Sequence, residues 1–168
     1  MKRSILFLLC LTVLLSALLA GCGGQKSSDD ILPAGTDLEA LYAEGMEALY
    51  AAYPDAQDNV IMFPESMDFM ASYCPGIEAY SYKQSVIYLH PVTGNACEVL
   101  LFELENSEDA AAVRDILQSH VDERADDTGY PETAAQWKNN ARVTSSGSFV
   151  FLAVLPDGYE LPAQFVLE

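Results

Sequence analysis

Apolar residues form one nearly unbroken run near the start of the chain and recur periodically after it. Residues 5–20 are apolar except for Thr12 and Ser16, and Lys2 and Arg3 precede them. A membrane-spanning helix needs about 20 apolar residues, so this run is short for a span. A positive start followed by a short apolar run is typical of a secretory signal. We therefore expect residues 1–21 to be a signal peptide that is cleaved.

Further along the chain, two long segments have apolar residues every three or four positions, which predicts amphipathic helices. The first follows a capping box at Thr36 and Glu39 and should end before Pro54. The second should begin near Ser107 and end before Gly129. Shorter helical patterns lie at residues 65–72 and 133–139.

Four segments have alternating or continuous apolar residues with turn residues between them, which predicts β-strands. They are residues 80–90, 97–105, 141–145 and 148–155. A turn at 91–96 joins the first two, and a tight Ser146–Gly147 turn joins the last two, so we expect two antiparallel hairpins. The last strand is apolar on both faces and should lie inside the sheet.

This order of elements predicts an α+β fold, with an antiparallel sheet of about four strands and helices packed on one face. The expected order is α-(short α)-β-β-α-β-β. After cleavage, residues 22–35 should form a flexible tether and residues 36–168 a single domain. The tail after Pro156 also contains Pro162, and it should be irregular or lie at an edge.

The first apolar run ends in a motif that contains a cysteine, Cys22. Leu19-Ala20-Gly21-Cys22 resembles the bacterial lipobox, in which the cysteine thiol receives a diacylglyceryl group and the chain is cut before that cysteine. Two acyl chains hold a protein stably at a membrane surface. We expect Cys22 to be the lipid attachment site, so that the mature protein is anchored at the extracytoplasmic face of the cell membrane.

The charge of the chain narrows the class of partner. The chain has eight basic and 25 acidic residues, and loss of Lys2 and Arg3 leaves six basic residues and a formal charge of −19. Nucleic acid is not an expected partner, because binding phosphates requires Lys and Arg. The expected partners are the membrane, through the lipid on Cys22, and an unknown protein, peptide or small ligand of the cell envelope.

The cysteines after Cys22 leave two interpretations open. Outside the cytoplasm, Cys74 and Cys97 could form a disulfide, and they could equally be separate buried thiols. No metal site is expected, because the histidines, His90 and His120, show no ligand spacing with these cysteines. No cofactor is expected.

The even positions of the strand at 80–90 form a candidate ligand face. Aromatic rings with polar tips suit the binding of sugars or peptides. The alternative is that the tyrosines pack beneath a helix with their hydroxyls at the rim of the core. The residues of this face are Tyr80, Tyr82, Gln84, Tyr88 and His90.

Catalytic motifs such as Gly-x-Ser-x-Gly, the P-loop and His-Glu-x-x-His do not occur in the sequence. His120 lies on the apolar stripe of its helix and His90 ends a strand, so we interpret both as structural rather than as general bases. We therefore expect a non-catalytic binding module. The alternative is an envelope hydrolase or lyase with a dispersed active site. A deep pocket that joins His90 or His120 to carboxylates would favour the enzyme.

The segment from about 37 to 156 resembles a family of uncharacterised lipoproteins from Firmicutes, the domain of unknown function 4358. The resemblance rests on the lipobox, on "DLEALYAEGMEAL", on a tyrosine-rich strand that leads into "EVLLFELENSEDAAAVRDIL", and on "ARVTSSGSFVFLAVLPD". The chain departs from this pattern after Pro156, where similar proteins often continue into a helix. The family has no established activity, so the resemblance implies no site residue beyond the lipidated cysteine.

Overall fold

Five β-strands form one antiparallel sheet in the residues that the computed structural model describes, 31–92 and 95–168. Neighbouring strands follow the order β1-β2-β3-β5-β4. The strands are β1 (Phe63–Pro64), β2 (Tyr82–Leu89), β3 (Glu98–Leu104), β4 (Arg142–Ser146) and β5 (Phe149–Val154). The helices are α2 (Leu38–Ala52), α3 (Ala56–Asn59), α4 (Met67–Met70), α5 (Ala110–Ala125) and α6 (Pro131–Asn140), with 3-10 turns η1 (Ile77–Ala79), η2 (Ser107–Asp109) and η3 (Ala163–Phe165).

The predicted α+β fold with an antiparallel sheet is confirmed, and β2–β3 and β4–β5 are antiparallel neighbours as expected. The expected number of about four strands is one too low. The additional strand, β1, pairs Phe63 with Leu89 and Pro64 with Tyr88. Because this strand has two residues, it is too short for an alternating pattern to be visible in the sequence.

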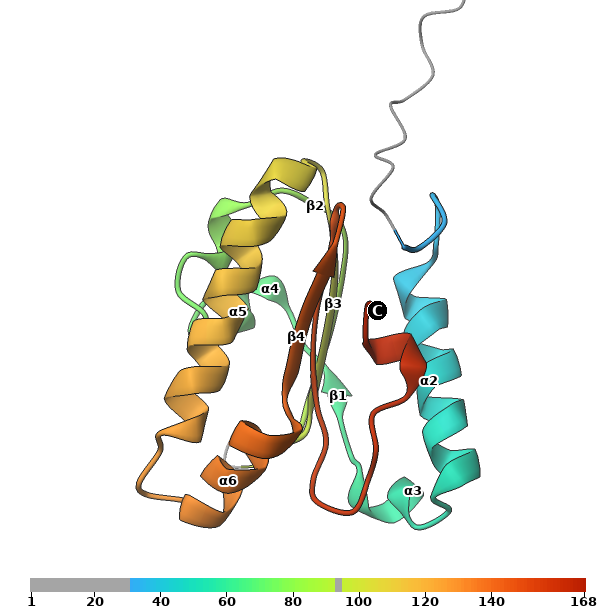
Figure 1. The fold of residues 1–168 in the computed structure, drawn as a ribbon, viewed down its shortest axis with the longest axis vertical. Coiled ribbons are helices and arrows are strands. Elements are labelled where there is room, and N and C mark those ends of the chain that lie inside the picture. Colours follow the sequence, from blue (N-terminus) through green and yellow to red (C-terminus); the bar gives the residue numbers. More distant parts are fainter. Residues whose placement is uncertain (1–30, 93–94) are drawn as a thin grey trace, which may run out of the picture.

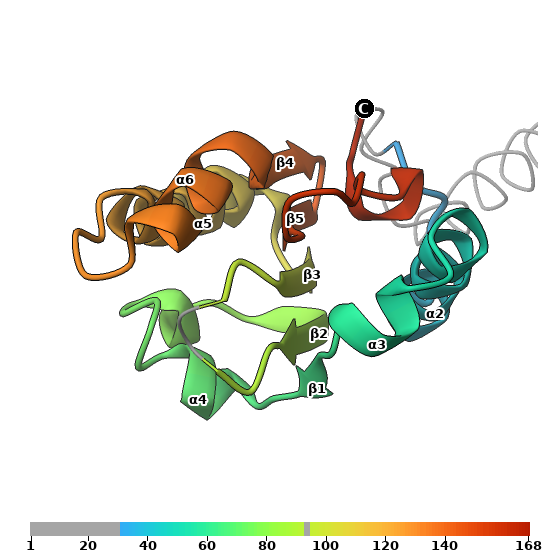
Figure 2. The same ribbon diagram turned by 90° about the horizontal axis from the view of Figure 1, so that it is seen from below.

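The helices lie on both faces of the sheet, so the expectation of helices on one face is wrong. Figure 1 shows the sheet between two layers, and in Figure 2 α4, α5 and α6 lie on one side and α2 and α3 on the other. The reason is that β3 and β5 are buried at every position. Strands that are apolar on both faces need a cover on both faces.

Each face of the sheet has its own hydrophobic core. On one face, which we call the α5-side core, sheet residues pack against α5 and α6: Ile87, Leu100, Phe102, Val150 and Leu152 with Val113, Leu117, Val121 and Trp137. On the other, the α2-side core, sheet residues pack against α2 and the tail: Val86, Val99, Leu101 and Phe151 with Leu38, Leu49, Phe165 and Leu167.

The tail after Pro156 is irregular apart from η3, yet it completes the α2-side core. Phe165 is fully buried and lies against Gly45 of α2. A Cβ atom at position 45 would collide with the Phe165 ring, so a glycine is needed for this close approach. Helix α2 therefore packs against both the sheet and a segment near the other end of the described chain.

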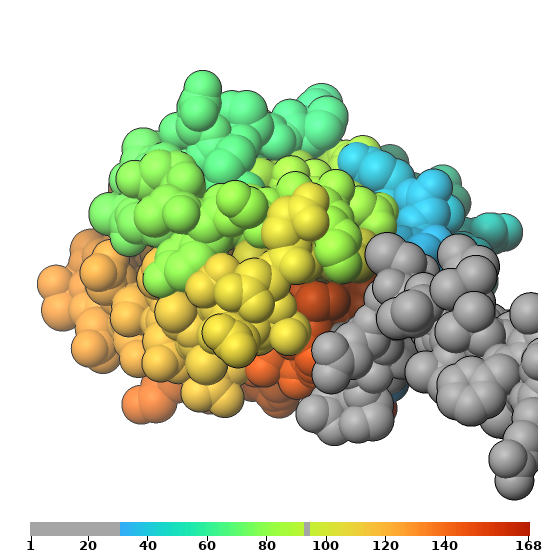
Figure 3. Space-filling view, turned by 90° about the horizontal axis from the view of Figure 1, so that it is seen from above, coloured from blue at the N-terminus to red at the C-terminus, as the bar shows by residue number. Residues whose placement is uncertain are grey.

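A side chain from β2 fixes the start of α2. The Leu38 N–H donates to Gln84 Oε1 (3.0 Å), and Gln84 Nε2 donates to the Thr36 carbonyl (2.8 Å). Asp37 caps the helix by accepting from the Glu39 and Ala40 N–H groups, so the N-cap lies one residue later than the predicted Thr36. Figure 3 views this end of the molecule, where the first residues of α2 lie beside those of the β2 region.

The described chain begins within the predicted tether and already contacts the domain. The Ile31 N–H donates to Ser146 Oγ (2.9 Å), and Leu32 packs against the α2-side core. The predicted signal peptide and Cys22 lie outside the described residues. Among the helices at 31–92 and 95–168, none is long and apolar enough to cross a membrane.

Candidate functional site

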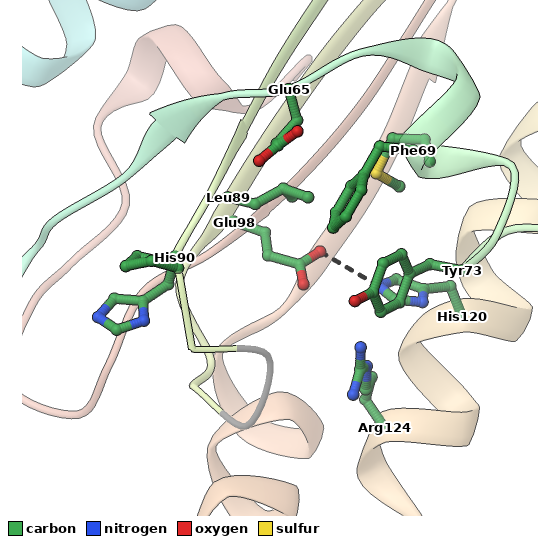
Figure 4. A pocket seen from close by; sticks show the side chains of 10 residues that line it. Glu65, Phe69, Tyr73, Leu89, His90, Glu98, His120 and Arg124 are labelled. Carbon is green, nitrogen blue, oxygen red and sulfur yellow. Dashed lines mark hydrogen bonds and ion pairs between the residues drawn. The ribbon is translucent and has the colours of Figure 1, made fainter.

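A cavity of about 50 Å³ lies on the α5 side of the sheet, where the ends of β2 and β3 face α4 and the last turns of α5. This volume corresponds to roughly four water-sized spheres. Its lining combines apolar, aromatic and charged side chains: Glu65, Phe69, Tyr73, Leu89, Glu98, His120 and Arg124. We call it the Glu98 cavity (Figure 4).

A buried histidine–glutamate pair forms the inner side of the Glu98 cavity. His120 Nε2 and Glu98 Oε2 are 3.1 Å apart, and the two side chains are 3% and 9% exposed. The rings of His120 and Trp137 meet edge to face, with their centroids 5.4 Å apart. A buried carboxylate needs a hydrogen-bonding partner, so the histidine and the glutamate account for each other's burial.

Aromatic rings and an arginine form the outer side of the Glu98 cavity. The rings of Phe69 and Tyr73 are tilted against each other with centroids 5.0 Å apart. Arg124 follows His120 by one helical turn, and its guanidinium lies 5.4 Å from the centre of the Tyr73 ring. This distance is within the range of a cation–π contact.

A second carboxylate reaches the Glu98 cavity from the segment between β1 and α4. The Glu65 N–H donates to the Ile87 carbonyl (2.9 Å), which holds this segment against β2. The Glu65 side chain is exposed, and Figure 4 shows its carboxylate on the opposite side of the cavity from Arg124. Within the described part of the chain, no salt bridge joins Arg124 to either glutamate.

Cys74 lies next to this site and lines a second cavity of about 240 Å³, which Tyr73 and His120 also border. Burial raises the pKa of the Cys74 thiol to about 12, and the charges of Glu98 and Glu123 raise it further. A thiol with such a pKa is protonated near neutral pH and is a poor nucleophile.

The two cysteines are separate free thiols on opposite faces of the sheet. Cys74 belongs to the α5-side core and Cys97 to the α2-side core, and both are buried. Of the two interpretations left open by the sequence, the structure has the two separate buried thiols and not the disulfide. Cys97 lies just before β3 and two positions before Val99, so its side chain enters the same core as Val99 and is directed away from Cys74.

The residues of the candidate ligand face on β2 do not share one side of the sheet as expected, because an irregularity in the strand divides them between its two faces. Tyr82 lies opposite Leu104 and Gln84 lies opposite Glu103, so one extra residue separates them. Such a bulge reverses which side of the sheet the following residues face. Tyr82 therefore packs on the α5 side, while Gln84 and Tyr88 lie on the α2 side.

The aromatic residues of that predicted face are packed, as the alternative interpretation expected. Tyr82 contacts Phe102 and donates its hydroxyl to the Ile77 carbonyl (2.7 Å). Tyr88 stacks on Tyr42 of α2 with ring centroids 3.7 Å apart. Tyr80 precedes β2 and packs against the α5-side core.

His90 borders the Glu98 cavity, but its ring points away from Glu98 and His120 (Figure 4). The Val92 N–H donates to His90 Nδ1 (3.0 Å), and Asn95 contacts the same ring. The His90 ring thus holds the turn that follows β2. Among residues 31–92 and 95–168, no group of three or more His, Cys, Asp or Glu side chains is placed to hold a metal ion.

The sequence does mark two residues of this site, Glu98 and His120, although neither belongs to the candidate ligand face. Glu98 has the same parity as Leu100, Phe102 and Leu104, so it falls on a face that should be buried. His120 falls on the apolar stripe of its helix. Two polar side chains on faces that must enter one core are expected to meet. Nothing comparable marks Glu65, Phe69, Tyr73 or Arg124.

Comparison with known proteins gives one match. No curated protein and no solved structure is significantly similar to the chain. Residues 55–155 match the family described as Domain of unknown function (DUF4358). The matched segment contains the whole sheet, the α5-side layer and the Glu98 cavity, whereas α2 and the tail after Leu155 lie outside it. Since the match covers more than half of the chain, the protein belongs to the DUF4358 family.

Proposed function

We propose that this protein is a non-catalytic binding module of the cell envelope, anchored to the membrane by a lipid on Cys22, and that the Glu98 cavity is its ligand site. The observation that carries the proposal is the convergence of charged and aromatic side chains from three separate parts of the chain on one cavity. They come from residues 65–73, from the start of β3 and from α5.

The alternative, a hydrolase or lyase, draws support from the position of His120 beside Glu98 in a cavity that Glu65 also lines. Two observations favour binding instead. His120 is 3% exposed and hydrogen-bonded to Glu98, so its imidazole is already engaged. The cavity of about 50 Å³ is also small beside typical ligand pockets of about 300–1,000 Å³. A small ligand, or one end of a larger one, fits this space better than the reacting centre of a large substrate.

The nearby thiol adds to the argument against nucleophilic catalysis. Cys74 has its pKa raised to about 12, whereas catalytic cysteines have lowered pKa values. No hydrogen bond joins Cys74 to His120, although both residues are described. A nucleophile activated by a base would need such a contact.

The anchor follows from the lipobox and from the overall charge. A mature chain with a formal charge of −19 is repelled by anionic lipid headgroups, so the lipid on Cys22 would supply the membrane affinity. The Cys22→Ala variant should appear outside the membrane fraction or stay unprocessed. Normal lipidation of that variant would contradict the anchor.

The binding site is tested by incubating the lipidated protein in detergent with an envelope extract and identifying retained small molecules by native mass spectrometry. We expect a ligand that is retained by the wild type and lost from Arg124→Gln. Arg114→Gln is the matched control, because Arg114 lies on the same helix but is exposed beside Asp115. Equal retention by all three proteins would exclude the cavity. Turnover of an extract component that depends on His120 would favour the enzyme.

A further inference from the structure

We propose that the ligand of the Glu98 cavity is a small zwitterion, an α-amino acid with a short side chain such as glycine or alanine. This inference rests on the proposed function of the cavity as a ligand site. It follows from the charged groups that face the cavity without pairing with one another: Arg124, Glu65 and one oxygen of Glu98.

Arg124 supplies the part of the site that suits a carboxylate. Its guanidinium carries five N–H donors, and among the described residues no acceptor is hydrogen-bonded to any of them. Its contact with Tyr73 is made through the face of the ring, which leaves the N–H groups available. A guanidinium and a carboxylate match each other in a two-point hydrogen bond, so a ligand carboxylate would satisfy this group.

Glu98 and Glu65 supply the part of the site that suits an ammonium group. Glu98 Oε2 is hydrogen-bonded to His120, but its other oxygen has no donor in the described parts of the chain. The Glu98 side chain is 9% exposed and lines the cavity, so an ammonium group bound there would supply a donor to that oxygen. Glu65 likewise has no partner among the residues described, and Figure 4 shows its carboxylate directed at the cavity.

Glu103, the other buried glutamate of β3, differs from Glu98 in its hydrogen bonds. Glu103 is buried on the other face of the sheet, and both of its oxygens have donors within the protein. Lys83 Nζ lies 3.0 Å from Oε1, and Gln84 Nε2 lies 2.8 Å from Oε2. Among the described residues, Glu103 therefore has a donor on both oxygens, whereas Glu98 has a donor on one.

Charge and size select a zwitterion over simpler ions. A plain cation would satisfy Glu65 and Glu98 but would face the unpaired Arg124, and a plain anion would face both carboxylates. A molecule that carries both charges on adjacent carbons satisfies all three groups. The cavity of about 50 Å³ has room for roughly four water-sized spheres, which limits a ligand to a few heavy atoms. Phe69 and Leu89 provide apolar contacts for the carbon between the charges.

Isothermal titration calorimetry on the lipidated protein in detergent tests this with three probes: glycine, methylammonium and acetate, at matched ionic strength. We expect glycine to bind at least about tenfold more tightly than either single-charge probe, because it makes charge-assisted hydrogen bonds at both ends. Arg124→Gln should weaken glycine binding by about tenfold or more and leave methylammonium binding unchanged or stronger. Glu65→Gln should weaken both, and Arg114→Gln should change neither.

A failure of the zwitterion proposal can be told apart from a failure of the cavity as a ligand site. If methylammonium or acetate binds as tightly as glycine, the zwitterion is overturned while the cavity remains a ligand site. If none of the three probes binds at millimolar concentration, the zwitterion is also overturned. The extract experiment then decides whether the cavity binds anything. Glycine binding that is equal in wild type and Arg124→Gln would overturn the assignment to this cavity, provided that circular dichroism shows both proteins folded.

Discussion

The two faces of the sheet are covered in different ways and contain different chemistry. The α5-side layer is contiguous in sequence with the sheet and lies within the family match, and it contains the cavity and the Glu98–His120 pair. Most of the α2-side layer comes from two segments that flank the match, α2 and the tail after Leu155, while the short α3 lies within the match. Its buried carboxylate, Glu103, is fully paired with Lys83 and Gln84.

This difference indicates how the two faces divide their roles. On the α2 side, the polar network is used for structure, because Gln84 joins Glu103 to the start of α2. On the α5 side, the polar pair borders a cavity, and one oxygen of Glu98 has no donor among residues 31–92 and 95–168. The proposed ligand site thus lies on the face whose helices α4, α5 and α6 are all within the family match.

Replacement of Phe165, the fully buried residue of the tail, should have the largest effect on stability. Phe165 is fully buried against α2, so Phe165→Ala should lower the free energy of unfolding by about 3–5 kcal/mol in urea denaturation. Glu160→Ala in the same tail is the control, because Glu160 is exposed, and its effect should stay within about 0.5 kcal/mol. A small loss for Phe165→Ala would mean that the α2-side core does not depend on the tail.

Replacement of the buried pair on the α5 side should separate stability from binding. His120→Leu leaves Glu98 without its partner and should cost about 3 kcal/mol. The double variant Glu98→Met/His120→Leu removes both polar groups, and its stability should return to within about 1 kcal/mol of the wild type. We expect glycine binding to be lost in the double variant.

The matched double variant on the α2 side should behave differently. Glu103→Met/Gln84→Leu removes the buried carboxylate and its partner, but it also leaves the Leu38 N–H and the Thr36 carbonyl without Gln84. It should therefore remain destabilised by about 2 kcal/mol or more in the same urea experiment. Recovery of both double variants to wild-type stability would remove the contrast between the two faces.

Cysteine alkylation should give the smallest difference between the faces. Burial raises the pKa of both Cys74 and Cys97 from 9.0 to about 12, so both thiols are less ionised at pH 8 than an exposed cysteine. Iodoacetamide should react slowly with both, and faster as the pH rises, because the thiolate is the reactive form. Cys74 lines a cavity, so mass spectrometry should find it alkylated before Cys97. The reverse order would place the more accessible face on the α2 side.

The long periodic elements of the fold could be predicted from the sequence, and the short or irregular ones could not. Helices α2 and α5 and the strands of both hairpins follow clear patterns, whereas β1 has two residues and no pattern. The layer on the second face was missed, although a fully apolar β5 implies a cover on both sides. An alternating pattern predicts which side of the sheet a residue faces only while the strand is regular. The extra residue between Tyr82 and Gln84 therefore placed the residues of the candidate ligand face on two different sides of the sheet.

The candidate site was only partly accessible to sequence reasoning. Glu98 and His120 stand out because each is polar on a face that must be buried. Tyr73 and Arg124 carry no local signal, because their positions depend on how α4 and α5 pack against the sheet. The separation of Cys74 from Cys97 has the same origin, since only the fold decides which face of the sheet each thiol enters.

The contact between Gly45 and Phe165 has a consequence for the order in which the protein folds. The two residues are 120 positions apart in the chain, so α2 is synthesised long before the segment that covers it. Contacts with such a large sequence separation form late, because a long loop must close first. Until then the part of the α2-side core that Phe165 fills remains exposed, and exposed apolar surface makes chains prone to aggregate. Chains that stop before Phe165 should persist in that state and become substrates for proteolysis.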